Sequence, residues 1–169
     1  YEDFGFAFHE GANQMGWDDA HDILSFPYVS PHWAMFWMPD VRDQPSREFV
    51  LERLAESLAD ENARSHRQAQ LVATSGIMNA QEQCHFTIGQ AHWAPSDFGP
   101  VGWFANFPAN ADPDLEGLGR GETTGGQAWR AVQSAIEDNA ARGVFVDGIY
   151  FDGVDERPTD NYQREHWRF

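Results

Sequence analysis

The stretch VFVDGIYFDGVDE, from Val144 to Glu156, places four carboxylates around an apolar run. A buried strand normally avoids ionisable groups, because an unpaired buried charge costs on the order of several kcal/mol or must give up its charge. Just before it, apolar residues recur at helical spacing from Trp129 to Ala140. Thr123 or Thr124 can cap the start of this helix, and Gly143 follows as a stop signal. A helix that leads straight into an apolar strand predicts a parallel β/α unit.

The rest of the chain adds a few elements of the same kinds. Leu51, Leu54 and Leu58 recur at helical spacing after Ser46, which predicts a capped amphipathic helix from Arg47 to about Arg67. Apolar runs predict strands in the segments 4–11, 23–29, 84–89, 101–108 and 148–151, with an aromatic loop after Val29. For 69–76 the pattern leaves a brief strand or a helix end open.

These elements predict an α/β fold of parallel β/α units. Four or five strands and two clear helices are fewer than the eight of each in a closed barrel of about 250 residues. We therefore expect a partial or incomplete TIM-barrel-like arrangement, with a smaller open sheet as the alternative. Residues 1–169 are expected to form a single domain that is a fragment of a larger (β/α) barrel.

Composition limits the classes of partner. The formal net charge is −16, from 27 acidic and 11 basic residues. Such a field repels phosphate backbones and anionic lipids, so we expect no nucleic-acid and no membrane partner. Every basic residue is Arg and none is Lys, which is typical either of a surface kept soluble in an extracellular or high-salt setting or of codon bias. One cysteine cannot form an intrachain disulfide, and no apolar run approaches eighteen residues.

Among the four carboxylates, Asp152 is the leading functional candidate. If GIYF is a strand, Asp152 stands at its carboxyl end, where parallel α/β folds collect catalytic residues. Asp147 stands at the strand's start, and we expect it to hold a loop amide or an Arg. Asp155 and Glu156 follow in the loop and could line the same opening or be solvated charges.

The segment DGIYFDGVDE resembles the strand-end DGxxxD signature of (β/α)-barrel glycoside hydrolases. FPYVSPHWAMFWMP, GPVGWFANFPANADPD and DGIYFDGVDERPTDNYQREHW follow in an order similar to the middle of large glycoside-hydrolase-like barrel proteins. The resemblance covers about Phe26 to Trp167 and implies that Asp152 is a catalytic carboxylate acting on a neutral poly- or oligosaccharide. It assigns no sugar.

Glycoside hydrolysis requires two carboxyl groups, one to donate a proton and one to act as nucleophile or base. Candidates for the partner of Asp152 are Glu10, Asp155, Glu156, or a residue outside the chain. Sugar sites also need flat apolar faces and polar hydrogen-bonding groups. The side chains that could supply them are Tyr28, His32, Trp33, His92, Trp93 and Asn106.

We expect no metal and no other cofactor. The seven His show no metal-ligand spacing, and DPDLEGLG at 112–119 misses the calcium-loop pattern, although a loosely bound Ca²⁺ there stays open. The alternative to a hydrolase is a non-catalytic carbohydrate-binding module. A self-assembling acidic module that buries its aromatic loops in a partner, or in the rest of a larger polypeptide, is the third possibility. A second carboxylate about 5–10 Å from Asp152 would favour the hydrolase.

Overall fold

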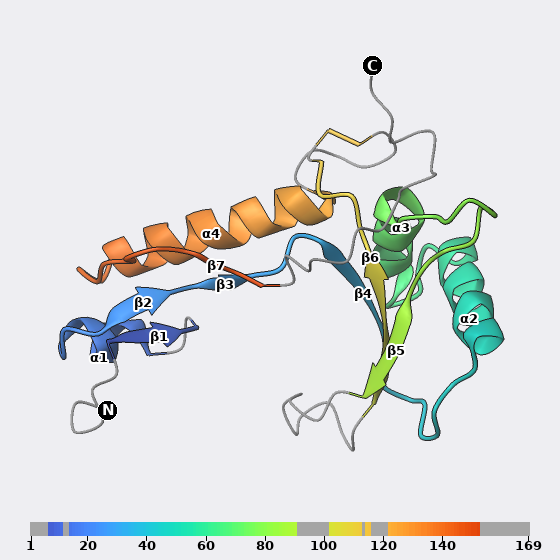
Figure 1. The fold of residues 1–169 in the computed structure, drawn as a ribbon, viewed down its shortest axis with the longest axis horizontal. Coiled ribbons are helices and arrows are strands. Elements are labelled where there is room, and N and C mark those ends of the chain that lie inside the picture. The colour runs from blue at the N-terminus through green and yellow to red at the C-terminus, as the bar shows by residue number, and fades with distance from the viewer. Residues whose placement is uncertain (1–6, 12–13, 91–101, 113, 116–121, 153–169) are drawn as a thin grey trace.

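The computed structural model describes residues 7–11, 14–90, 102–112, 114–115 and 122–152 (Figure 1). Within this part of the chain it has seven strands and four helices, arranged around two regions of sheet. One region is a three-stranded antiparallel sheet with helices on one side. The other consists of short parallel strands close to the longest helix.

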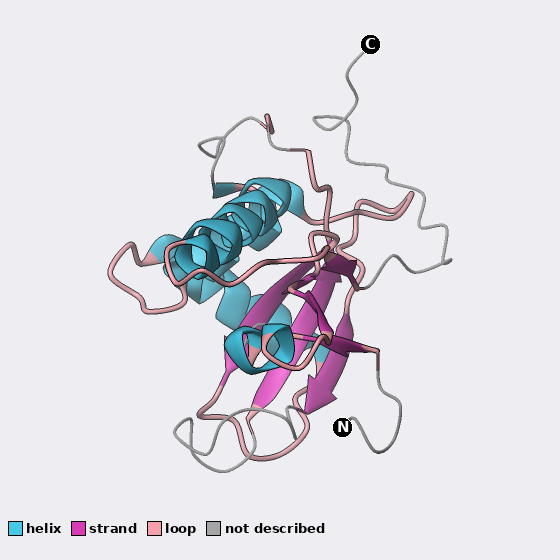
Figure 2. Ribbon diagram, turned by 90° about the vertical axis from the view of Figure 1, so that its left-hand side faces the viewer, coloured by secondary structure: helices cyan, strands magenta, loops and turns pink. Residues whose placement is uncertain are grey.

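The antiparallel sheet has the strand order β4-β6-β5, formed by β4 (Trp33–Met38), β6 (Trp103–Pro108) and β5 (Thr87–Gln90). Figure 2 shows these strands side by side. In β4, buried residues alternate with partly buried ones, as expected for a sheet with one face on the core. We had expected a loop here, but Pro31 and Pro39 lie outside the segment, so neither removes a hydrogen bond from the strand's ladder.

Two helices cover the buried face of this sheet, α2 (Arg47–Ala59) and α3 (His66–Ser75). The shared core is apolar and almost fully buried, and the largest of its side chains with less than 2% exposed surface are Phe36, Met38, Val50, Val72 and Phe107. Burying side chains of this size contributes roughly 1.5–3 kcal/mol each relative to leaving them exposed.

The first predicted helix is shorter than expected, and most of the segment 69–76, for which a strand or a helix end was open, lies in the separate helix α3. Ser46 caps α2, accepting a hydrogen bond from the amide of Phe49 at 3.2 Å, as the sequence predicted. The helix stops at Ala59 rather than near Arg67, because Asp60 turns to an extended conformation and accepts the amide of Asn62 at 3.0 Å. The apolar stripe contains Val50 and Leu54, whereas Leu51 is exposed.

The parallel strands are β1 (Phe8–Glu10), β2 (Leu24–Phe26), β3 (Tyr28–Val29) and β7 (Tyr150–Phe151). β1 pairs with β2, and β3 pairs with β7. Only Pro27 separates β2 from β3, so the two strands follow each other directly along the chain, the first paired with β1 and the second with β7. Asp147 extends the second contact, because its amide donates to the carbonyl of Ser25 and its carboxylate accepts the amide of Ser25.

Two further helices accompany these strands, α1 (Met15–Asp19) and α4 (Thr124–Ala140). Thr123 caps α4 by accepting the amide of Gly126 at 3.0 Å, and Gly143 takes a left-handed φ of 73° just after the helix, which the sequence signals predicted. The predicted apolar face is largely bare, however: Val132 is buried, whereas Trp129 and Ile136 are exposed.

The predicted fold of parallel β/α units forming a partial barrel is wrong. The largest sheet is antiparallel, and the parallel pairs have two strands each, so the described residues show no barrel pattern. The prediction missed β4, which was expected to be a loop, and β4 is the strand that pairs antiparallel with β6. Its sequence WAMFWM is apolar at every position, with Trp33 and Trp37 partly buried on the face away from the core, so no alternation indicated a strand with one buried face.

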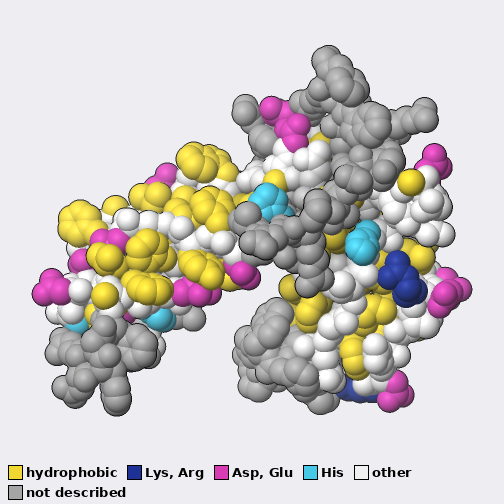
Figure 3. Space-filling view, viewed as in Figure 1, with side chains coloured by type: hydrophobic (Ala, Val, Ile, Leu, Met, Phe, Trp, Pro, Cys, Tyr) yellow, Lys and Arg dark blue, Asp and Glu magenta, His cyan; other side chains and the backbone are white. Residues whose placement is uncertain are grey.

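Exposed apolar side chains gather around the parallel strands and α4. Except for Phe49 and Leu51 in α2, every large hydrophobic residue classed as exposed among the described residues belongs to this region or to α1: Phe8, Trp17, Leu24, Tyr28, Trp129, Ile136, Phe145, Tyr150 and Phe151. Figure 3 shows the corresponding hydrophobic side chains over this part of the molecule. None of the described helices is long and apolar enough to cross a bilayer.

Candidate functional site

A pocket of about 520 Å³ lies where the parallel strands meet the antiparallel sheet. Its walls come from β3 and the residue after it, from β4, from β6 and from the residue after β7. The lining residues are Tyr28, Ser30, Trp33, Met35, Asn106 and Asp152. We call this cavity the Tyr28–Asp152 pocket. It combines an indole, a phenol, an amide, a hydroxyl and a carboxylate, which together can contact both the apolar and the polar parts of a ligand.

The pleat of the antiparallel sheet points two β4 side chains into this pocket. Trp33 and Met35 alternate with the core residues Ala34 and Phe36, so they occupy the opposite face of the sheet. Asn106 of β6 is the direct cross-strand partner of Met35 and shares that face. The strand that the sequence did not predict therefore supplies one wall of the site.

Asp152 is held at the carboxyl end of β7. Its amide donates to the carbonyl of Val29 at 2.9 Å, and its carboxylate accepts a short hydrogen bond from the hydroxyl of Tyr28. The rings of Tyr28 and Tyr150 stack with centroids 6.0 Å apart, which orients the phenol. This short network fixes the carboxylate with respect to both parallel strands.

The phenol of Tyr28 is held in its neutral form. Partial burial, followed by the hydrogen bond to Asp152 and the negative charges of Asp152 and Glu10, raises the pKa of Tyr28 to about 12. A neutral phenol remains a hydrogen-bond donor across the whole physiological pH range. Tyr28 can therefore keep donating to Asp152 while other groups of the pocket bind a ligand.

Glu10 lies near this network without lining the pocket. It ends β1, is exposed, and its charge contributes to the raised pKa of Tyr28. Two carboxylates, Glu10 and Asp152, thus act on the same phenol from the ends of different parallel strands. Of the predicted catalytic carboxylates, Glu10 and Asp152 are the two within the described residues.

Asn106 carries an unsatisfied acceptor. Its side-chain oxygen Oδ1 is buried and has no hydrogen-bond partner among the described residues. Burying an amide without a partner costs on the order of 1–3 kcal/mol, so such a group is stabilised by any donor that reaches it. Because this oxygen has almost no exposed surface, a hydroxyl or amine in the pocket reaches it only when the wall around Asn106 moves.

The structure brings four of the predicted residues to one pocket: Tyr28, Trp33, Asn106 and Asp152. His32 is exposed and does not line it. His92, Trp93, Asp155 and Glu156 lie outside the described residues. Ser30 and Met35 also line the pocket and were not predicted. Alternation of faces along β4 would have indicated Met35, and the position directly after Val29 would have indicated Ser30.

The described residues contain no group of three or more His, Cys, Asp or Glu that could hold a metal ion. Asp147, which the sequence predicted to hold an amide or an Arg, accepts the amide of Ser25 at 2.9 Å.

Comparisons of this chain with protein-family models, with curated proteins and with solved structures found no match.

Proposed function

We propose that this chain binds a neutral carbohydrate in the Tyr28–Asp152 pocket. The observation that carries the proposal is the lining of the pocket, in which the indole of Trp33 stands beside the amide of Asn106 and the carboxylate of Asp152. Sugars present apolar C–H faces and a ring of hydroxyls, so they need a flat aromatic surface beside hydrogen-bonding groups of both kinds. The strongly negative net charge of −16 favours neutral over anionic glycans.

In this proposal each lining residue has a defined part. Trp33 contacts the apolar face of the sugar ring, and the amide group of Asn106 forms a hydrogen bond with one hydroxyl. Asp152 keeps one hydrogen bond from Tyr28 and uses its remaining lone pairs to accept from a second hydroxyl. Charge-assisted hydrogen bonds of this kind are about twice as strong as neutral ones, so Asp152 contributes most to orientation.

Glycoside hydrolysis at the same pocket is the second candidate. The observation that favours it is that Glu10 and Asp152 follow parallel strands and both act on Tyr28. In a hydrolytic reaction one of these carboxyl groups would protonate the leaving oxygen, and the other would attack the anomeric carbon or activate a water.

The test is binding and turnover of a panel of neutral oligosaccharides, measured by titration calorimetry and by release of reducing ends. Trp33→Ala is expected to weaken binding about fivefold to tenfold through the lost ring contact. Trp129→Ala is the matched control, because Trp129 is 62% exposed on α4 and lies outside the pocket. Failure of every glycan to bind, or equal losses in the two variants, would overturn the proposal.

Asp152→Asn separates the two candidates. The substitution removes the charge, keeps the shape, and leaves an amide oxygen that can still accept from Tyr28. A hydrolase loses turnover in Asp152→Asn and in Glu10→Gln while the substrate still binds. A binding module shows no turnover in the wild type, and only its affinity changes in Asp152→Asn.

A further inference from the structure

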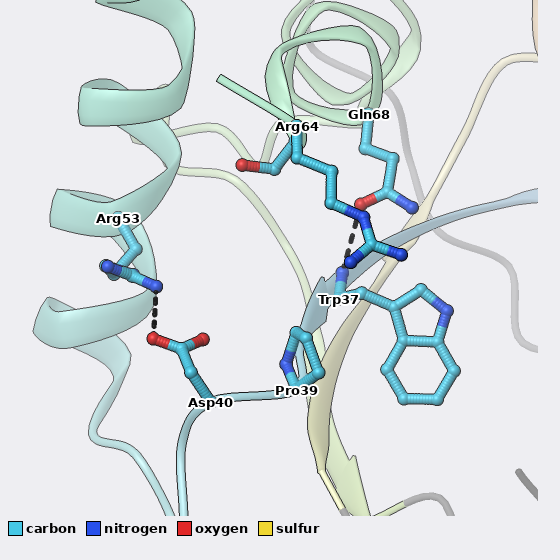
Figure 4. A pocket seen from close by; sticks show the side chains of 7 residues that line it. Trp37, Pro39, Asp40, Arg53, Arg64 and Gln68 are labelled. Carbon is cyan, nitrogen blue, oxygen red and sulfur yellow. Dashed lines mark hydrogen bonds and ion pairs between the residues drawn. The ribbon is translucent and has the colours of Figure 1, made fainter. Parts of the chain in front are cut away.

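A second pocket, of about 410 Å³, lies between β4 and the two helices that cover the antiparallel sheet. It is lined by Trp37, Pro39, Asp40, Arg53, Arg64, Ser65 and Gln68. None of these residues lines the Tyr28–Asp152 pocket. Figure 4 shows the guanidinium of Arg64, the amide of Gln68 and the indole of Trp37 close to one another. We call this cavity the Arg64 pocket.

The acceptors of the Arg64 pocket are already engaged. Asp40 accepts from Arg53 at 2.7 Å, which pairs the carboxylate with a cation (Figure 4). The side-chain oxygen of Gln68 accepts the amide of Trp37 at 3.4 Å.

The Ser65 hydroxyl in this pocket is also engaged. It shares a hydrogen bond with Ser57 at 2.7 Å. The internal bonds of the pocket therefore involve its carboxylate, its amide oxygen and its hydroxyl.

Two hydrogen-bond donors of the pocket remain available to a ligand. The guanidinium of Arg64 makes no hydrogen bond or ion pair with the described residues, and Figure 4 shows it beside Gln68 and Trp37. The amide nitrogen of Gln68 is the second donor, because only the oxygen of that amide is engaged. With Asp40 neutralised by Arg53, the local charge is positive on a chain whose net charge is −16.

From this inventory we infer that the Arg64 pocket binds a carboxylate attached to a flat apolar body. The carboxylate takes the planar fork of Arg64, whose geometry matches it with two parallel hydrogen bonds, and a further donor is available on Gln68. The flat body lies against Trp37, because an indole offers a large apolar face beside the guanidinium. Ligands that fit this description include aryl carboxylates and the uronate unit of an acidic saccharide.

Charge and shape exclude other classes of ligand. A cation is repelled by Arg64, and the one carboxylate of the pocket, Asp40, is already paired with Arg53. A small anion without an apolar body would use Arg64 alone, and an exposed Arg pairs weakly with such an ion in water. Selectivity for a carboxylate joined to a flat ring therefore depends on Arg64 and Trp37 together.

The test uses benzoate as the probe, with benzamide as the neutral analogue and acetate as the analogue without a ring, each titrated by ligand-observed NMR. Benzoate is expected to bind more tightly than either analogue, and Arg64→Gln to weaken it about tenfold, as expected for loss of a charge-assisted pair. Arg142→Gln is the matched control: Arg142 makes no ion pair with the described residues, lies outside the pocket, and follows α4. It should leave benzoate affinity unchanged.

Three results would overturn the inference: absence of saturable benzoate binding, equal affinity for benzamide, or unchanged affinity in Arg64→Gln. Arg64→Lys keeps the charge and removes the fork, so it is expected to recover only part of the affinity. Glucuronate is then titrated against glucose to distinguish the two ligand sources. Tighter binding of glucuronate than of both glucose and benzoate assigns the pocket to acidic saccharides. Tighter binding of benzoate than of glucuronate assigns it to aryl carboxylates.

Discussion

Replacing Phe107 by Ala tests the antiparallel sheet that displaced the expected barrel. Phe107 has no exposed surface, pairs with Ala34 across β4 and β6, and its ring centroid lies 4.7 Å from that of Phe86. Removing a fully buried phenyl ring from such a site costs about 3–5 kcal/mol, as lost transfer free energy plus the cavity that remains. Domains have free energies of unfolding of about 5–15 kcal/mol, so the loss is a large share of the total.

The measurement is urea unfolding at 25 °C, followed by far-ultraviolet circular dichroism. The midpoint should fall while the dependence on urea keeps its slope, because the surface exposed on unfolding hardly changes. Phe145→Ala is the matched control: Phe145 is 73% exposed, and its loss should change the free energy of unfolding by less than about 0.5 kcal/mol. If Phe107→Ala does not fold, Phe107→Leu is measured in its place, and its free energy of unfolding is expected to fall by less than about 1.5 kcal/mol. Equal effects of the two Phe→Ala changes would refute the buried position of β6.

Two further predictions concern a helix cap and the phenol of the Tyr28–Asp152 pocket. Ser46→Ala should lower the free energy of unfolding by about 1 kcal/mol because the amide of Phe49 loses its acceptor, whereas Ser46→Asp, which keeps an acceptor, should match the wild type in the same urea assay. Tyr28 should ionise near pH 12, which an absorbance titration near 295 nm measures as the difference between the wild type and Tyr28→Phe. Because the pKa of Tyr28 in the folded protein lies above the ordinary value of 10.0, its contribution to stability is present below pH 10 and disappears between pH 10 and 12. In Asp152→Asn the pKa of Tyr28 should fall but remain raised, since partial burial is the largest cause; a phenol that titrates at its ordinary pKa in the wild type would contradict the hydrogen bond to Asp152.

Local chemistry was predictable from the sequence, and pairing between distant segments was not. Ser46, Thr123 and Gly143 affect only the helix ends next to them, so these caps and this stop could be predicted from the local sequence. The direction of β4 against β6 depends on contacts between segments about seventy residues apart. Its sequence, apolar at every position, gives no alternation that would distinguish an antiparallel strand from a parallel one.

The candidate site shows the same division. Residue chemistry was enough to name Tyr28, Trp33, Asn106 and Asp152, and the structure places all four around one pocket, although their roles stay predictions. Ser30 and Met35 have side chains with no distinctive chemistry, and only the pleat of β4 and the end of β3 bring them there. The Arg64 pocket was not predicted at all, because the significance of an Arg depends on which neighbouring carboxylates are already paired.

The pairing of β3 with β7 also sets an order of events during folding. The amide of Ser25 and the carboxylate of Asp147 are 122 residues apart in sequence, so this contact closes a loop that includes nearly all of the described chain. Such closures lose much chain entropy before any contact forms, whereas α2 and α3 require only neighbouring residues. We expect the helical layer to gain protection from hydrogen exchange first and the amide of Asp152 last, which pulse labelling during refolding would measure. On a ribosome, the carboxylate of the Tyr28–Asp152 pocket would then reach its phenol only after synthesis has passed every other described element.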